Sequence, residues 1–127
     1  MITKKERPET LKGVTIKVKV AYDNLYLTIN ELDGEPFEIF CVYGKSGLDM
    51  TAQTEGIGRL VSLALRSGIS VSEIVKQLKH IGGETPIPQK GWVILSIPDA
   101  IAKVLESRYL KTDTIKPKDE REGKNGN

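Results

Sequence analysis

The chain has 127 residues, with 19 Lys and Arg against 17 Asp and Glu and 39% hydrophobic residues, a composition typical of one globular domain. A single Cys and a single His exclude an intramolecular disulfide, a redox dithiol and a cysteine-rich zinc site. No stretch approaches the ~20 apolar residues of a membrane span, and the polar start lacks the apolar centre of a signal peptide. We therefore expect a cytoplasmic protein without a membrane partner.

The net charge of +2 is too small to predict nucleic-acid binding, but the charges are unevenly distributed. Residues 23–55 carry one basic and seven acidic residues, and such a segment repels phosphate. The basic residues are scattered and Lys-rich, without interleaved aromatic residues, which is typical of a solvated surface. These features disfavour a nucleic-acid partner.

Three strands are predicted in the first third of the chain. Residues 14–20 and 25–29 alternate apolar and polar side chains, as half-buried strands do, and a polar turn separates them. Asp33 and Gly34 form a second turn. Residues 36–43 are apolar on both faces, which predicts a strand that is central in the sheet or covered on each side.

A helix follows the third strand. Apolar residues recur there at helical spacing, and Asp49 or Thr51 is expected to cap the helix start. Gly68 should end the helix in a left-handed conformation. Gly56 and Gly58 each destabilise a helix interior by about 1 kcal/mol relative to Ala. Two glycines so close together therefore indicate either that the helix packs tightly on the sheet or that it starts later.

A second helix is predicted from the capping-box spacing of Ser70 and Glu73, and Gly82 and Gly83 should end it. The short connection predicts that the first two helices form an antiparallel or steeply crossed hairpin. His80 falls near the end of this second helix, where the helix dipole favours a cation.

The last part of the domain is expected to hold a loop, a strand and a helix. Residues 84–89 contain two prolines and predict an extended loop, and the apolar run 92–95 predicts a fourth strand. Ser96 or Asp99 can cap a third helix, with Pro98 near its first turn. The expected fold is α+β: a three- or four-stranded antiparallel meander, a helical hairpin, and a C-terminal helix packing across a sheet edge.

The chain divides into an N-terminal arm at residues 1–12, a single domain at residues 13–110 and a polar tail at residues 111–127. The tail has almost no apolar content, so we expect it to be disordered. An open edge of the sheet would allow two copies to pair, and a homo-oligomer is therefore one alternative.

The turn after the third strand is the candidate binding motif. It lies between a strand and a helix, where backbone N–H groups and the helix dipole could hold a phosphate. The spacing of a P-loop is absent, and Asp49 nearby weakens the hypothesis. The candidate nucleotide- or phosphate-binding residues are Gly44, Lys45, Ser46, Gly47 and Arg59, with Arg66 as a further cation.

No pattern typical of catalysis is visible in the sequence. Ser-His-Asp, Cys-His and HExxH arrangements are absent, so we predict no catalytic residues, no metal ligands and no cofactor. Cys41 alternates with Phe37 and Ile39 and is interpreted as a small buried hydrophobic residue.

Three segments of the sequence, taken in their order along the chain, resemble those of a known family. They are RPETLKGVT at residues 7–15, GKSGLDMTAQTEGIGRLVSLALRSGISVSEIVKQLKHI at residues 44–81, and SIPDAIAKVLE at residues 96–106. Together they are similar to the TSCPD domain, found near the C-terminus of adenosylcobalamin-dependent ribonucleotide reductases and in small free-standing proteins. The resemblance covers about residues 7–110, and the residues that match the family signature are Ser96, Pro98 and Asp99.

The chain departs from this family at the cysteines. The resemblance implies cysteines after the turn at residues 44–47, after the second helix and within the signature, but here those positions hold Asp49, Gly83 and Ile97. If the family's thiolates bind a metal, this chain lacks the soft ligands, and we expect no structural zinc.

Ribonucleotide reduction requires a radical-forming cysteine and a reducing cysteine pair, so a chain with one Cys cannot perform it alone. The first hypothesis is a non-catalytic accessory or regulatory module in deoxyribonucleotide synthesis. Such a module would contact a ribonucleotide reductase subunit or another protein, and would be at most a component of a ribonucleoside-diphosphate reductase system. The alternative is a small nucleotide- or nucleic-acid-binding module that uses the turn at residues 44–47. A degenerate domain whose function has changed is a third interpretation.

Overall fold

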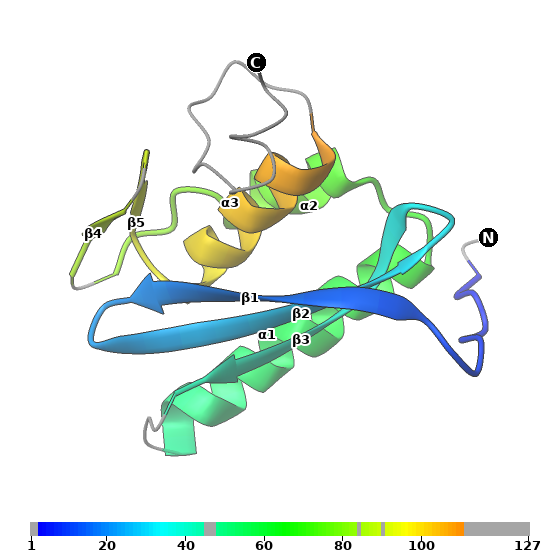
Figure 1. Ribbon diagram of the computed structural model, residues 1–127, viewed down its shortest axis with the longest axis horizontal. Helices are drawn as coiled ribbons and strands as arrows, with labels where there is room; N and C mark the ends of the chain where they lie inside the picture. The colour runs from blue at the N-terminus through cyan, green and yellow to red at the C-terminus, as the bar shows by residue number, and fades with distance from the viewer. Residues whose placement is uncertain (1–2, 45–47, 84, 90, 111–127) are drawn as a thin grey trace.

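A three-stranded antiparallel sheet in the order β1-β2-β3 forms the first part of the fold. The computed structural model describes residues 3–44, 48–83, 85–89 and 91–110. The strands are β1 (Lys12–Val20), β2 (Asp23–Leu32) and β3 (Glu35–Tyr43). The predicted meander is confirmed, and Figure 1 shows the three strands side by side with α1 behind them.

The two faces of the sheet have different surroundings. One face carries core residues, and Leu25, Leu27 and Ile29 of β2 are completely buried there. The other face carries Phe40 and Val42 of β3, which are 56% and 60% exposed. The prediction of a central or doubly covered third strand is wrong, because β3 is an edge strand whose outward side chains face solvent.

The first helix, α1 (Leu48–Arg66), packs along β3. It begins before both predicted caps, so Asp49 and Thr51 lie inside its first turn and the capping prediction is wrong. Gly68 has a φ of +87°, and its N–H donates to the carbonyl of Leu65 at 3.1 Å. This is the left-handed closure that the sequence predicted.

One of the two helix glycines marks a close contact between α1 and the sheet. A Cβ at Gly58 would lie 3.3 Å from Cys41 Sγ, which is tighter than ordinary packing. A Cβ at Gly56 would meet nothing within 4 Å. Tight packing therefore explains Gly58, and nothing in the structure explains Gly56.

The second helix, α2 (Val71–Leu78), begins at the predicted cap, where Ser70 Oγ accepts a hydrogen bond from the Glu73 N–H at 3.1 Å. It ends earlier than the expected stop at Gly82, since Lys79 is already extended and His80 has a left-handed φ of +69°. His80 therefore lies beyond the helix, not within its last turn. α2 packs mainly against the third helix and only lightly against α1.

A small hairpin follows α2. The predicted fourth strand forms as β5 (Trp92–Ile94), but it pairs with β4 (Ile87–Gln89) in a separate two-stranded sheet. The prediction of an extended loop over residues 84–89 is therefore wrong for the part that forms β4. The Gln89 side chain donates to the Lys19 carbonyl at 2.7 Å and accepts from the Lys19 N–H at 3.2 Å, so it occupies the open edge of β1.

The third helix, α3 (Ile97–Tyr109), contributes much of the core. Ser96 is its cap, since Ser96 Oγ accepts from the Asp99 N–H at 3.2 Å, and the alternative of Asp99 as the cap is excluded. The helix lies against α2, β1 and β5. The buried residues of α3 are Ile97, Asp99, Ala100, Ile101, Ala102, Val104 and Leu105.

The described part of the N-terminal arm is bonded to the domain. The Lys5 N–H donates to the Arg66 carbonyl at 2.9 Å, and Arg66 Nη2 donates back to the Lys5 carbonyl at 2.7 Å. Arg7 Nη2 pairs with Glu38 at 2.9 Å. The arm thus connects the end of α1 to β3, while the tail at residues 111–127 lies outside the described residues.

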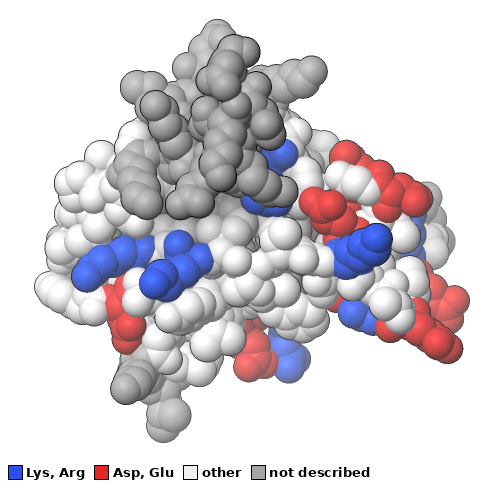
Figure 2. Space-filling view, in the orientation of Figure 1, with Lys and Arg blue, Asp and Glu red and all other residues white. Residues whose placement is uncertain are grey.

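The uneven charge distribution of the sequence is visible on the surface. Figure 2 shows acidic side chains gathered near the end of the sheet that carries the β2–β3 turn. Glu31, Asp33 and Glu35 belong to this turn and its flanking strand ends.

Candidate functional site

The family-signature residues lie where β5 ends and α3 begins. Asp99 is completely buried. Its carboxylate accepts from the His80 N–H at 2.7 Å, from the Leu95 N–H at 2.9 Å and from Lys103 Nζ at 2.8 Å. A buried charge is stable only when it is paired and hydrogen-bonded, and Asp99 meets both conditions. We conclude that this carboxylate holds three segments of the fold together.

Ser96 extends the same network. Ser96 Oγ donates to the Ile81 carbonyl at 2.6 Å, in addition to capping α3. Lys103 Nζ also donates to the Val93 carbonyl at 2.6 Å. Pro98 lies in the first turn of α3, where its missing N–H costs nothing. The signature therefore bonds the segment after α2 to the start of α3.

A cavity of 710 Å³, here called the signature cavity, lies beside this junction. It is bounded by the β1–β2 turn, the first half of α1 and the start of α3. Its walls include Tyr22, Met50, Ile57, Ser96 and Pro98. Its size is in the range of small-molecule pockets.

The three positions at which the resemblance implies cysteines lie in or beside the wall of the signature cavity. Gly83 and Ile97 line it, and Asp49 directly precedes the lining residue Met50. Gly83 and Ile97 carry no ligating side-chain atom, so these residues do not fit a thiolate metal site. Within the part of the chain that the structure describes, no three His, Cys, Asp or Glu side chains gather closely enough to hold a metal ion.

The predicted phosphate-binding turn begins beside a carboxylate. The φ of Gly44 is +36°, which strains any other L-residue, and a Cβ there would lie 2.1 Å from the present position of the Asp23 carboxylate carbon. A carboxylate at this position repels phosphate. Lys45, Ser46 and Gly47 lie outside the described residues, and their binding role stays a prediction.

Arg59 and Arg66 lie away from this turn. Arg59 is about 16 Å along α1 from Leu48, and its Nη2 pairs with Glu55 at 2.8 Å. Both arginines line a groove between β3 and α1. The structure therefore places Arg59 and Arg66 along one groove and does not bring them to Gly44.

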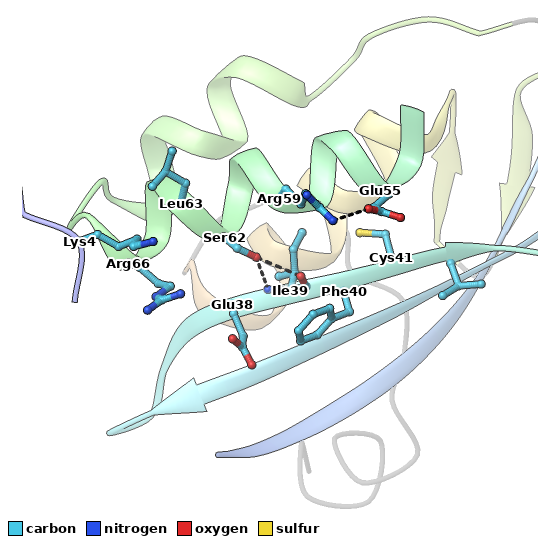
Figure 3. Close-up of a pocket in the computed structure, with 12 residues that line it drawn as sticks. Lys4, Glu38, Ile39, Phe40, Cys41, Glu55, Arg59, Ser62, Leu63 and Arg66 are labelled. Carbon is cyan, nitrogen blue, oxygen red and sulfur yellow. Dashed lines mark hydrogen bonds and ion pairs between the residues drawn. The ribbon is translucent and has the colours of Figure 1, made fainter. Parts of the chain in front are cut away.

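This second hollow, the β3 edge groove, has a volume of 560 Å³ and is shown in Figure 3. Its lining includes Lys4, Phe40, Cys41, Arg59, Leu63 and Arg66. The sequence interpretation missed the groove because it treated the third strand as central in the sheet or covered on each side. The apolar pattern on both faces of β3 was the sequence signal at this place, and a buried strand shows the same pattern.

Ser62 occupies the open edge of β3 within the groove. Ser62 Oγ accepts from the Ile39 N–H at 2.9 Å and donates to the Ile39 carbonyl at 3.0 Å (Figure 3). Gln89 bonds Lys19 in the same two-way manner at the β1 edge. Because unpaired strand edges promote association, these side chains work against edge-to-edge pairing of two copies.

Two titratable groups near the groove have shifted pKa values. Burial alone would raise the pKa of Glu38, but hydrogen bonds from Arg7 and Asn30 outweigh it and hold this pKa below its usual range. Burial raises the pKa of the Cys41 thiol to about 12. Cys41 is therefore protonated at neutral pH and a weak nucleophile.

The comparison with known families agrees with the resemblance in the sequence. A family model described as the TSCPD domain matches residues 2–109 of the chain. No curated protein and no solved structure matches it. Among the described helices, none has the length and apolar character needed to cross a membrane. The match spans nearly all of the described fold, and the chain therefore belongs to the TSCPD domain family, which is associated with the C-terminal region of ribonucleotide reductases.

Proposed function

We propose that this chain is a non-catalytic accessory module of a ribonucleotide reductase system, working in the cytoplasm through contact with a reductase subunit. The observation that carries the proposal is the family match over residues 2–109, because the family is associated with the reductase C-terminal region. An accessory role requires a stable scaffold and a contact surface, and it requires no reacting group of its own.

The chemistry of the described side chains supports a non-catalytic role. Both Asp99 oxygens are engaged in hydrogen bonds inside the fold. The thiol of Cys41 is protonated at neutral pH, because burial raises its pKa to about 12. A single such thiol cannot supply the radical and the dithiol that ribonucleotide reduction needs.

The nucleotide-binding alternative has less support from the described residues. Asp23 lies against the start of the turn that would hold the phosphate, and Arg59 lies in the β3 edge groove instead. Nucleotide binding is nevertheless a useful competing outcome in the experiment below.

The test is a binding measurement between the full chain and the purified catalytic subunit of the ribonucleotide reductase from the same organism. We expect a complex of defined stoichiometry by light scattering and a change in reductase turnover when the chain is added. A folded chain that neither binds the subunit nor alters its turnover would refute the proposal. Binding of ADP with no binding of the subunit would favour the nucleotide alternative.

A further inference from the structure

The β3 edge groove has an elongated shape. Its α1 wall extends from Glu55 to Arg66, about 16 Å along the helix. An extended polypeptide advances about 3.3 Å per residue, so this length holds about five residues. The shape suits a strand-like segment better than a compact small molecule.

Apolar side chains form the rims of the groove. Phe40 and Val42 project from the outer face of β3 and are 56% and 60% exposed. Leu63 lines the groove from α1 and is 47% exposed. Large apolar side chains that lie together on a surface and are rimmed by charges are typical of a protein contact site.

The two ends of the groove carry different charges. Lys4 and Arg66 lie at one end, as Figure 3 shows, and neither forms an ion pair within the described part of the chain. Arg66 donates to the Lys5 carbonyl and lies over the Phe37 ring at 5.2 Å, and neither contact neutralises its charge. At the other end the charge of Arg59 is offset by Glu55.

The remaining acidic residue of the groove, Glu38, pairs directly with Arg7, and the charge of Arg66 also helps to lower its pKa. Glu38 is almost completely buried and accepts from Arg7 Nε and Nη2 at distances of 2.9 to 3.1 Å. With Glu38 neutralised by Arg7, the end formed by Lys4 and Arg66 is positively charged. A partner that places a carboxylate there gains electrostatic complementarity.

We propose that the β3 edge groove binds an extended acidic and apolar segment of a partner protein, with a carboxylate at Lys4 and Arg66 and apolar side chains against Phe40, Val42 and Leu63. The proposal rests on the proposed function, because it names the surface and the chemistry through which the module makes contact. A nucleotide fits less well, since its phosphates need several cations in one place, whereas the groove has Lys4 and Arg66 at one end and an Arg59 that is offset by Glu55 at the other.

The segment would lie beside β3, but it could not form a continuous ladder of backbone hydrogen bonds with that strand. Ser62 already bonds the backbone of Ile39, and Gly58 lies against Cys41, so α1 covers these parts of the strand edge. Side-chain contacts with the rims, rather than a continuous backbone ladder, should therefore determine the specificity.

The test selects ligands for the full chain from a displayed library of random peptides about twelve residues long, which is the segment length plus flanking residues. We expect selected peptides to be enriched in Asp and Glu beside Leu, Ile, Val or Phe. Two variants, Lys4→Glu and Leu63→Ser, should each weaken the best peptide's binding about tenfold by fluorescence polarisation.

Matched variants outside the groove provide the controls. Lys19→Glu reverses an exposed lysine on β1, and Leu60→Ser changes an α1 leucine that is 69% exposed and does not line the groove. Both should leave the binding within about twofold of the original. Circular dichroism should show that all four variants are folded.

Three results would overturn the proposal. The first is a selection with no enrichment of acidic residues, and the second is equal loss of binding in the groove and control variants. The third is displacement of the peptide from the original chain by ADP but not by an excess of unlabelled peptide. If the chain binds a reductase subunit and Lys4→Glu leaves that binding unchanged, the groove assignment fails while the proposed function stands.

Discussion

The carboxylate of Asp99 accepts a hydrogen bond at 2.7 Å from the backbone N–H of His80, 19 residues earlier in the chain. His80 has a left-handed φ of +69°, which is uncommon for a residue other than glycine. The bond holds the sharp turn after α2 against the start of α3. A residue of the family signature therefore stabilises the connection between two helices.

Replacing Asp99 by Asn should destabilise the fold by about 3 kcal/mol, because Lys103 loses its charged partner and an amide N–H₂ faces a backbone donor. Urea denaturation followed by circular dichroism measures the change. Asp49→Asn, at an exposed position in the first turn of α1, should cost no more than about 1 kcal/mol. Equal effects of the two substitutions would contradict the role assigned to Asp99.

Removing the Ser62 hydroxyl should expose the open edge of β3. Ser62→Ala leaves the N–H and carbonyl of Ile39 without their present partner, and we expect a loss of about 1 to 2 kcal/mol. Hydrogen exchange should show faster exchange of the Ile39 amide. Ser72→Ala, at an exposed position of α2, serves as the control, and unchanged exchange at Ile39 would disprove the interpretation.

The Arg7–Glu38 pair should make stability depend on pH in the acid range. The pKa of Glu38 is lower in the folded protein than its ordinary value of 4.5, so the folded state favours the ionised form. The resulting stabilisation is fully present above about pH 4.5 and is lost as the pH falls through the lower, folded pKa.

Denaturation midpoints measured between pH 7 and pH 3 test this dependence. The stability difference between the original chain and Glu38→Gln should be constant near neutral pH and should shrink below about pH 4.5. Glu35→Gln changes an exposed carboxylate on the same strand and provides the comparison. If the stability difference between the original chain and Glu38→Gln increased as the pH fell, the assigned role of the Arg7–Glu38 pair would be wrong.

Cys41 should react slowly in the folded protein. Because burial raises the pKa of its thiol to about 12, little thiolate exists at pH 8. An aromatic disulfide reagent should modify it about a hundredfold more slowly, or slower still, in the native chain than in guanidinium chloride. Equal rates in the two conditions would show that the thiol is accessible and ionised, contrary to its position under α1.

The sequence predicted the elements whose signals are local. Alternating residues defined β1 and β2, Ser70 and Ser96 capped their helices, and Gly68 closed α1 through its left-handed conformation. Each of these features depends on neighbours within a few residues, so a single sequence contains the information needed.

The features that were missed depend on distant residues. α2 ends just before His80, whose N–H bonds to Asp99, and no local pattern reveals that partner. The position of β3 at the edge follows from the strand order, because the apolar pattern of Phe40 and Val42 fits a buried strand equally well.

For the candidate site, too, the local features were predicted from the sequence and the features that depend on distant residues were not. Arg59 and Gly44 were grouped because a loop and the following helix are adjacent in sequence, but helix geometry places Arg59 several turns away and beside β3. Ser96 and Asp99 were identified from the family signature. Their bonding role became apparent only when the residues after α2 were seen against them.

In the proposed role, the chain works by contacting a ribonucleotide reductase and not by its own chemistry. Titration calorimetry of the full chain against the purified catalytic subunit from the same organism tests it most directly. We predict saturable binding at a defined stoichiometry and a change in the reductase rate when the chain is added. A folded chain that gives no binding heat at any concentration, together with an unchanged reductase rate, would contradict the account.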